Sequence, residues 1–477
     1  MKKVFAAAVC ALVLPTLAQG KIAQARTAYV QIQPEVSANS DKPSTEGQTS
    51  PPSSDGTPAP LVLFGRPLRS LYTSGVLLSS TFYDDAQANP VGGLSHGSAN
   101  AGAGTLGADI DLRKIAGIGG ARVHLLFTYE FGDTLQKNIG NFIKSQDWYL
   151  PFQKFQLAQL GYEQSLLDGR LNLYGGRVSA ATMFAKPTFG CNFVSGSQCP
   201  YDLPVFTGGF SGFPYATWGG RVRFNPTPRL YVEGGAFSVD PNRKNLHGFD
   251  FGLKTATGVA APVEIGYETD FGNDRYPRHY KLGGWYNNAP SVDPLLNRVG
   301  QSRALSGGTA LTNDFGRGGI YALADQVIYR PDDSHRSLAL FGSYAAPFDQ
   351  RELFSSQSTL GAYFVGPLAN RRHDSAGIMV TGLVFTKAET LFMNQLLGKN
   401  GSTTFVHRHQ YDIEANYGAQ LEPGVVITPN VEYIVHPDTT QRPDARFAPK
   451  NAVVVGLRLT LNFNDMLGVP SALPRLR

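Results

Sequence analysis

The sequence predicts an all-β fold: a transmembrane antiparallel β-barrel of about 16 strands around a water-filled lumen. Three observations support this prediction. They are the composition, long stretches of alternating apolar and polar residues, and the lack of an apolar segment long enough for a membrane helix. The 477 residues include 53 Gly, 21 Tyr and 29 Phe, but the charged fraction is only 17%. Such a composition is typical of strands joined by turns.

The alternation is clearest in the last third of the chain. Successive side chains of a strand point to opposite faces, so an alternating strand has one apolar and one polar surface. One face of the run 408–420 carries Arg408, Gln410, Asp412, Glu414, Asn416 and Gln420. A soluble sandwich could produce the same pattern. The run from Asn451 to Phe463, however, is longer than a usual soluble strand and suits a tilted membrane-spanning strand of about 9 to 11 residues with its ends.

Short turns alternate with long connections, an asymmetry typical of outer-membrane barrels. Short turns are expected at Asp168–Gly169, Pro226–Pro228, Pro331–His335 and Glu422–Gly424. The stretches Ser179–Tyr215 and Ala289–Arg317 are long and loop-like, and such loops face outside or fold into the pore. Closure of the barrel is required, because an open strand edge in lipid would leave N–H and C=O groups unpaired at several kcal/mol each.

The first residues, 1–25, have the features of a secretory signal peptide. Lys2 and Lys3 precede an apolar stretch from Val4 to Leu17, and cleavage candidates follow at Ala18 and Ala25. No later segment is apolar over the roughly 18 residues that a membrane helix needs. Export is therefore expected, and any membrane span must consist of strands.

The rest of the chain divides into three parts. Residues 26–63 are rich in Ser, Thr and Pro and are expected to form a disordered tail or linker. Residues 64–463 form the barrel domain, and residues 464–477 form a C-terminal extension. Loss of the signal peptide would remove three lysines and lower the formal charge from +5 to +2. A nearly neutral mature chain argues against nucleic acid as a partner.

Cys10 lies in the signal peptide, so the mature chain keeps Cys191 and Cys199. An oxidising periplasm permits a disulfide, and the seven intervening residues can fold back to bring the sulfurs together. The alternative is a metal or redox site, which lacks support from a Cys-x-x-Cys spacing or a neighbouring His.

Aromatic residues lie near many of the expected strand ends, as in the girdles that mark the two membrane interfaces. Ordinary strand packing is the alternative interpretation for each of them. The examples are Trp148, Tyr149, Trp285, Tyr286, Tyr321, Tyr329 and Phe463.

A series of short runs after about Phe64 follows an order that a known family shares. They are Leu106–Arg113, Ile115–Ala121, Gln159–Gln164, Leu167–Leu171, Gly175–Arg177, Cys191–Phe193, Cys199, Thr217–Val222, Glu264–Tyr267, Lys281–Tyr286, Asp325–Gln326, Tyr329 and Val455–Arg458. In these runs the chain resembles the carbohydrate-selective porin family known as OprB. The resemblance implies a sixteen-stranded barrel, diffusion of glucose and other small sugars, and a pore narrowed by inward loops and by charged or aromatic side chains. Chains of this family commonly end in an aromatic residue, whereas fourteen residues follow Phe463 here.

A sugar in a pore needs donors and acceptors that replace part of its hydration, and charged residues on the polar strand faces can supply them. Arg221 and Arg223 share the face opposite Trp218, Val222 and Phe224, and are therefore expected in the lumen. The candidate pore-lining or substrate-binding residues are Arg177, Arg221, Arg223, Arg458, Glu163, Glu264, Glu268, Glu414 and Glu432. In the alternative interpretation these charges only solvate a wet wall and balance one another.

The leading functional hypothesis is a passive outer-membrane porin for small sugars. The alternatives are a general or anion-preferring diffusion pore and a structural or adhesive barrel. No nucleophile-elbow sequence or other enzymatic constellation is present, so no catalytic residue, cofactor or metal is predicted. His407 and His409 share a strand face, but no third ligand is evident. The expected partners are small carbohydrates, outer-membrane lipid, the barrel-assembly machinery and a second copy of the chain, with no nucleic acid.

Overall fold

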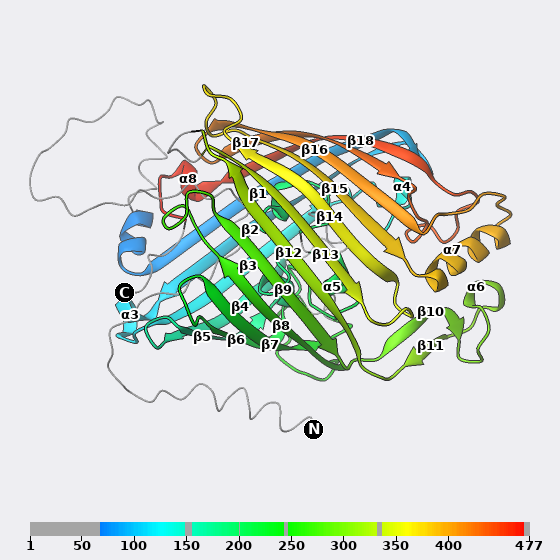
Figure 1. The fold of residues 1–477 in the computed structure, drawn as a ribbon, viewed down its shortest axis with the longest axis horizontal. Coiled ribbons are helices and arrows are strands. Elements are labelled where there is room, and N and C mark those ends of the chain that lie inside the picture. The colour runs from blue at the N-terminus through cyan, green and yellow to red at the C-terminus, as the bar shows by residue number, and fades with distance from the viewer. Residues whose placement is uncertain (1–66, 148–154, 200, 243–246, 332–335, 472–477) are drawn as a thin grey trace, which may run out of the picture.

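A computed structural model describes residues 67–147, 155–199, 201–242, 247–331 and 336–471. The predicted signal peptide and N-terminal tail, and Trp148 and Tyr149, lie outside the described residues. The described chain forms a closed antiparallel barrel of sixteen strands (Figure 1). The predicted fold class is confirmed.

Each barrel strand pairs with the next one along the chain, except that β9 pairs with β12, and β1 pairs with β18 to close the barrel. The sixteen strands are β1 (Val76–Gly93), β2 (Gly97–Asp111), β3 (Ala121–Gly132), β4 (Phe155–Leu166), β5 (Leu171–Val178), β6 (Thr217–Phe224), β7 (Leu230–Val239), β8 (Gly258–Glu268), β9 (Arg278–Asn287), β12 (Arg317–Tyr329), β13 (Ser337–Pro347), β14 (Phe354–Val365), β15 (Ser375–Phe385), β16 (His409–Glu422), β17 (Val425–Val435) and β18 (Lys450–Asn462). A separate two-stranded sheet consists of β10 (Ser291–Asn297) and β11 (Ala310–Asn313).

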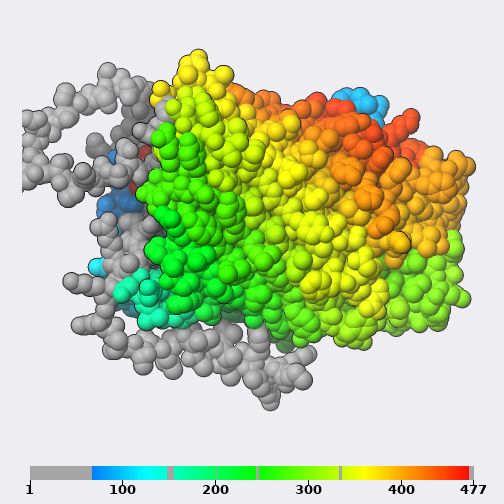
Figure 2. Space-filling model, viewed as in Figure 1, coloured from blue at the N-terminus to red at the C-terminus, as the bar shows by residue number. Residues whose placement is uncertain are grey.

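The two faces of the barrel wall differ as the alternation predicts. On β16, Gln410, Asp412 and Glu414 are buried inside, whereas Tyr411 faces outward and is exposed. The outward positions of other strands are large and apolar, such as Leu360 on β14 and Leu282 on β9. Figure 2 shows one side of this outer wall as a continuous surface. The wall therefore presents apolar side chains outward and polar side chains inward.

The turns are short at one end of the barrel, where both ends of the described chain also lie (Figure 1). This end carries a helical segment at residues 67–73, α3 (Leu112–Ala116) and α8 (Phe463–Met466). The described part of the predicted C-terminal extension packs here, because Val469 is buried against Leu77, and Arg69 Nε donates to the carbonyl oxygen of Gly468 at 3.0 Å. In the turn between β16 and β17, Gly424 has a φ of +78°, and a Cβ there would lie 2.4 Å from the Asn462 carbonyl oxygen, so this tight turn requires glycine.

The long connections lie at the opposite end. The β9–β12 connection carries β10, β11 and α6 (Arg303–Ser306), and the β15–β16 connection carries α7 (Lys387–Lys399). The two connections are joined, since Ser302 Oγ donates to Gln395 Oε1 at 2.5 Å and Lys399 Nζ donates to the Ala304 carbonyl oxygen at 3.0 Å.

Two other connections fold inward. The β3–β4 connection, described over residues 133–147, contains α4 (Gln136–Ile139). The β5–β6 connection contains the 3₁₀ turns η1 (Ala180–Thr182) and η2 (Gly190–Asn192), and α5 (Asp202–Phe206). The largest hydrophobic cluster lies where the β5–β6 connection packs on the inner wall, with Phe184 and Phe210 among its buried members.

Of the residues expected in an aromatic girdle, some face outward, as a girdle requires, and others face inward, where the prediction is wrong. Tyr286 and Tyr329 face outward and are half exposed. Trp285 and Tyr321 are buried and point inward, where their rings stack at a centroid distance of 6.2 Å. The reason is the alternation itself, because adjacent residues such as Trp285 and Tyr286 cannot both face lipid.

Candidate functional site: a constriction inside the barrel

The β5–β6 connection, residues 179–216, is called the constriction segment below, because it runs along the inside of the barrel wall. The Ala185 N–H donates to Glu264 Oε2 of β8 at 3.1 Å. Thr188 Oγ1 donates to Asp325 Oδ2 of β12 at 2.6 Å. The Leu203 N–H donates to Gln357 Oε1 of β14 at 2.9 Å. Strand side chains therefore hold the segment against the inner wall.

The predicted disulfide between Cys191 and Cys199 is present, with a Cα–Cα distance of 4.9 Å. It closes a turn whose backbone and side chains are anchored to the wall. The Val194 and Ser195 N–H groups donate to the Glu414 carboxylate at 2.8 to 3.0 Å. Ser195 Oγ also donates to Asp412 Oδ2 at 2.7 Å. A carboxylate that accepts several backbone N–H groups makes strong charge-assisted bonds, so the turn is held firmly on β16.

The inward β3–β4 connection packs beside this turn. The Gly196 N–H donates to the Lys144 carbonyl oxygen at 2.8 Å, and the Asp147 N–H donates to the Val194 carbonyl oxygen at 3.0 Å. Gln146 Nε2 donates to the Asp85 carbonyl oxygen on β1 at 2.9 Å. The two inward connections therefore contact each other and the wall.

Arg458 of β18 lies where these elements meet. It pairs with Asp85 of β1 through two hydrogen bonds, donates to Asp147 of the β3–β4 connection, and donates to the Phe193 carbonyl oxygen of the constriction segment. Next to it, Glu432 of β17 accepts a hydrogen bond from Gln87 Nε2 at 3.1 Å. Arg458 and Asp85 are buried and paired with each other, whereas the buried Glu432 has an uncharged amide as its hydrogen-bond partner.

The wall from β2 to β6 carries a continuous row of inward polar side chains. His124 lies between two carboxylates, with Nδ1 2.6 Å from Asp109 Oδ1 and Nε2 2.8 Å from Glu163 Oε2. Asn172 Nδ2 donates to Glu163 Oε1 at 2.6 Å, and Arg221 Nη2 donates to Asn172 Oδ1 at 2.6 Å. The row therefore links five neighbouring strands by side chains as well as by the backbone.

The row continues from β6 to β9 with more open side chains. Arg223 Nη2 donates to Glu268 Oε2 at 2.9 Å, and its guanidinium lies 3.6 Å from the centre of the Tyr231 ring. Lys281 Nζ lies 3.7 Å from Glu268 Oε1. The Glu268 side chain is 31% exposed and that of His279 is 25% exposed, so both are open to water. This part of the row offers charged donors and acceptors to a solute.

Each predicted pore-lining residue has a defined place. Arg221, Arg223, Glu163 and Glu268 belong to the polar row, whereas Arg458, Glu414, Glu432 and Glu264 lie behind or beside the inward connections. Arg177 donates to the carbonyl oxygens of Asp250 and Ala216, at the end with long connections. Their contact with a substrate stays a prediction.

The sequence prediction missed several residues of the site. His279 and Lys281 alternate with Tyr280 and Leu282 on β9, so the period of two could have identified them. Asp85 also lies on a strand, so the same periodicity could have identified it. Asp147 lies in a connection without periodicity, and nothing in the sequence indicated its position.

The constriction segment also holds a buried carboxyl group. Burial raises the pKa of Asp202 in α5 to about 8, although nearby Lys144 opposes this increase. The protonated form is therefore favoured at neutral pH.

Among the described residues, no group of three or more His, Cys, Asp and Glu side chains is arranged to hold a metal ion. In the same part of the chain, no helix is long and apolar enough to cross a bilayer.

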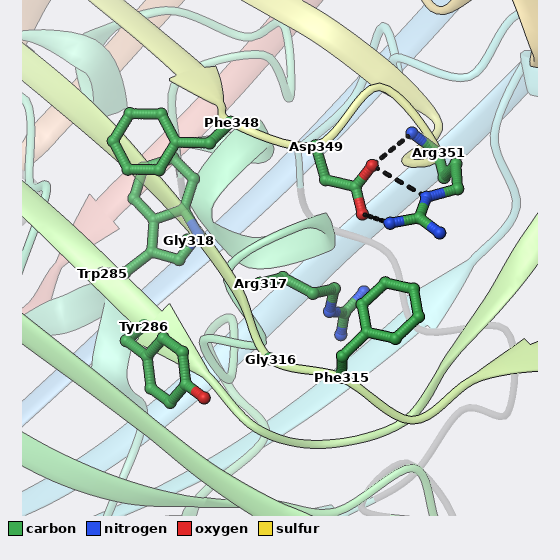
Figure 3. A pocket seen from close by; sticks show the side chains of 9 residues that line it. All are labelled: Trp285, Tyr286, Phe315, Gly316, Arg317, Gly318, Phe348, Asp349 and Arg351. Carbon is green, nitrogen blue, oxygen red and sulfur yellow. Dashed lines mark hydrogen bonds and ion pairs between the residues drawn. The ribbon is translucent and has the colours of Figure 1, made fainter.

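A pocket of about 660 Å³ opens at the end with long connections, between β9, the start of β12 and the residues after β13 (Figure 3). Tyr286, Phe315 and Phe348 line it with exposed rings. Arg351 pairs with Asp349 at 3.0 and 3.1 Å and lies 4.3 Å from the centre of the Phe315 ring. The pocket therefore combines apolar rings with one ion pair at the rim of the barrel.

A family model described as "Carbohydrate-selective porin, OprB family" matches residues 95–463. This chain belongs to the OprB family. Porin B of Pseudomonas aeruginosa is 25% identical to this OprB-family chain over 373 residues, which are 75% of the chain and 80% of the relative. The putative porin QuiX of Acinetobacter baylyi is 23% identical over 439 residues, which are 84% of the chain and 92% of the relative.

Among solved structures, the high-pH structure of Pseudomonas putida OprB matches this OprB-family chain with a TM-score of 0.76 at 23% identity. The match covers 84% of the chain and 97% of that protein. The low-pH structure of the same protein matches with a TM-score of 0.52 at 18% identity, over 84% of the chain and 96% of that protein. The family and the fold are those of an outer-membrane channel rather than of an enzyme.

Proposed function

We propose that this OprB-family chain lets small sugars such as glucose diffuse passively across the outer membrane into the periplasm. The observation that carries the proposal is a closed barrel whose interior is polar and is narrowed by a firmly anchored segment. Membership of the carbohydrate-selective family supports the choice of sugars as the solute class.

The polar row supplies the chemistry that a sugar needs. Hydroxyl groups both donate and accept hydrogen bonds, and the open side chains of Glu268 and His279 lie beside Arg223 and Lys281. These groups replace part of the hydration of a sugar in the pore, so that selectivity comes from the lining and the width. The concentration gradient supplies the driving force, and no cofactor takes part.

The proposal includes the route and the surroundings of the protein. Residues 1–25 direct export and are cleaved, the barrel-assembly machinery inserts the chain, and outer-membrane lipid surrounds the apolar outer wall. A second copy of the chain is a further proposed partner, whereas nucleic acid is not.

Solute uptake tests the proposal. Liposomes that contain the purified protein are expected to swell faster in glucose than in a zwitterionic amino acid of similar size, because the polar lining offers hydrogen-bond donors and acceptors that suit hydroxyl groups. Protein-free liposomes are the control. Equal swelling rates would instead support a general diffusion pore, and negligible swelling and conductance would support a structural or adhesive barrel.

A further inference from the structure

The barrel closes where its first and last strands meet, and Arg458 lies at this seam. Asp85 of β1 stands opposite Arg458 of β18 in the antiparallel register. Arg458 Nε and Nη2 donate to the two carboxylate oxygens of Asp85 at 2.5 and 2.7 Å. Both side chains are almost fully buried. A bidentate pair of this kind fixes the orientation of the guanidinium group, and therefore the direction of its remaining N–H donors.

The remaining donors reach both inward connections. Nη2 also donates to Asp147, in the β3–β4 connection, and Nη1 donates to the Phe193 carbonyl oxygen of the constriction segment at 3.2 Å. The partners Asp85, Asp147 and Phe193 are 373, 311 and 265 residues from Arg458 along the chain. One side chain therefore joins the seam to two loops that lie far from it in sequence.

We propose that Arg458 is a positioning residue, the latch that holds both inward connections against the closed seam and thereby sets the width of the constriction. The inference rests on the proposed function, since it assigns the limit on solute size to this residue. The inference also changes the role predicted for Arg458. This residue does not contact the solute, but affects its passage by positioning the two inward connections.

The chemistry of the latch requires arginine. A guanidinium group offers five N–H donors in a fixed planar fork and can serve three partners in different directions, which a lysine ammonium group does less well. Without the guanidinium, Asp85 and Asp147 would be two buried carboxylates without their shared cation. A buried charge that loses its partner is strongly unfavourable. Asp147 lies in a loop, whereas Asp85 lies in a strand, so Asp147 and its loop are expected to move away from the seam.

The barrel itself does not depend on the latch. β18 keeps its backbone pairing with β1 and β17 over most of its length. The turn between Cys191 and Cys199 keeps its bonds to Glu414, so the change is confined to a partial release of the two connections. A wider pore in a folded barrel is therefore the specific signature of the latch.

The experiment uses the full chain with Arg458→Met, which keeps a long side chain but removes every donor. Its single-channel conductance is expected to rise about twofold or more, because conductance follows the cross-section of the pore. Trisaccharides that the wild type retards are expected to enter liposomes faster, and the inward connections should become sensitive to protease. Arg458→Lys should give an intermediate conductance. Arg442→Met, which breaks an exposed ion pair with Asp444 outside the strands, is the matched control and should behave like the wild type.

The outcomes separate the latch from the proposed function. If Arg458→Met still migrates as a folded, heat-modifiable barrel and keeps the conductance and size limit of the wild type, the latch is wrong. If the wild type fails the sugar-uptake test, the proposed function fails, whereas salt conductance and proteolysis still decide the latch. If Arg458→Met does not fold, Asp147→Asn replaces it, since this change leaves the Asp85 pair intact. A folded Asp147→Asn barrel with unchanged conductance and unchanged protease resistance would then overturn the proposal.

Discussion

At the scale of single residues, the charged side chains inside the barrel have two different tasks. Glu414 and Glu264 accept hydrogen bonds from backbone N–H groups of the constriction segment. Their carboxylate oxygens are therefore largely occupied by contacts within the protein. Arg223 and Glu268 belong to the more open part of the polar row, where the Glu268 side chain is 31% exposed. Both kinds of residue occupy alternating positions along their strands. The alternation shows that a side chain points inward, but not what it contacts there. Only the partners distinguish an anchor from a lining residue.

Glu389 allows a test of pH dependence outside the membrane-spanning strands. This side chain of α7 is buried, and burial raises its pKa to about 7 from the ordinary 4.5, with a further contribution from Asp438. A raised carboxyl pKa means that stability is fully present below about pH 4.5 and is lost as the pH rises through 7. The upper limit of this loss is about 3 kcal/mol, from 1.36 kcal/mol per pKa unit.

Glu389→Gln is therefore expected to stabilise α7 at pH 8.5 and to have little effect at pH 4.5. Hydrogen–deuterium exchange of the α7 amides measures this locally, with the amides of β14 as the internal control. Faster exchange in the variant than in the wild type at pH 8.5 would contradict the assignment.

At the scale of elements, the constriction segment is the least predictable part of the molecule. Its length and lack of alternation indicated a long loop, but not the surface against which it packs. The disulfide between Cys191 and Cys199 could be inferred because both cysteines follow the predicted signal peptide and lie close together in sequence. The anchoring of the intervening turn on β14 to β16 could not, since those strands lie more than 150 residues further along the chain.

Removing the disulfide with Cys191→Ser and Cys199→Ser is expected to loosen this turn without opening the barrel. A disulfide that closes a loop of this length contributes about 2 to 3 kcal/mol of stability. The hydrogen bonds to Glu414 remain when the disulfide is removed. We expect larger fluctuations of the open-channel current. A reducing agent should produce the same fluctuations in the wild type and no further change in the double variant. Equal current noise in all four conditions would show that the wall contacts alone hold the turn.

At the scale of the whole molecule, the barrel separates an apolar outer surface from a polar interior. Leu360 lies in the middle of β14, faces outward and is 73% exposed, as expected of a lipid contact. Val299 lies outside the barrel strands and is 75% exposed, so it offers a matched apolar position away from the wall.

Leu360→Arg is therefore expected to destabilise the folded barrel in lipid by about 2 to 4 kcal/mol, the cost of a charged residue near the bilayer midplane. Val299→Arg should change the stability little. Urea unfolding in liposomes, followed by tryptophan fluorescence, measures both. Equal stabilities of the two variants would mean that the wall of β14 does not face lipid.

The sequence by itself determined the barrel, its number of strands within a small range, the family, and the inward face of the strands with the clearest alternation, such as β16. These properties depend on residues that are close together in the sequence, namely on alternation with a period of two, on turn residues and on short motifs. The tertiary structure alone decided which inward charges meet, as with Arg458, Asp85 and Asp147, and where the two inward connections lie. Those contacts join residues hundreds of positions apart, and their partners are chosen by strand register and barrel closure, which no local pattern encodes.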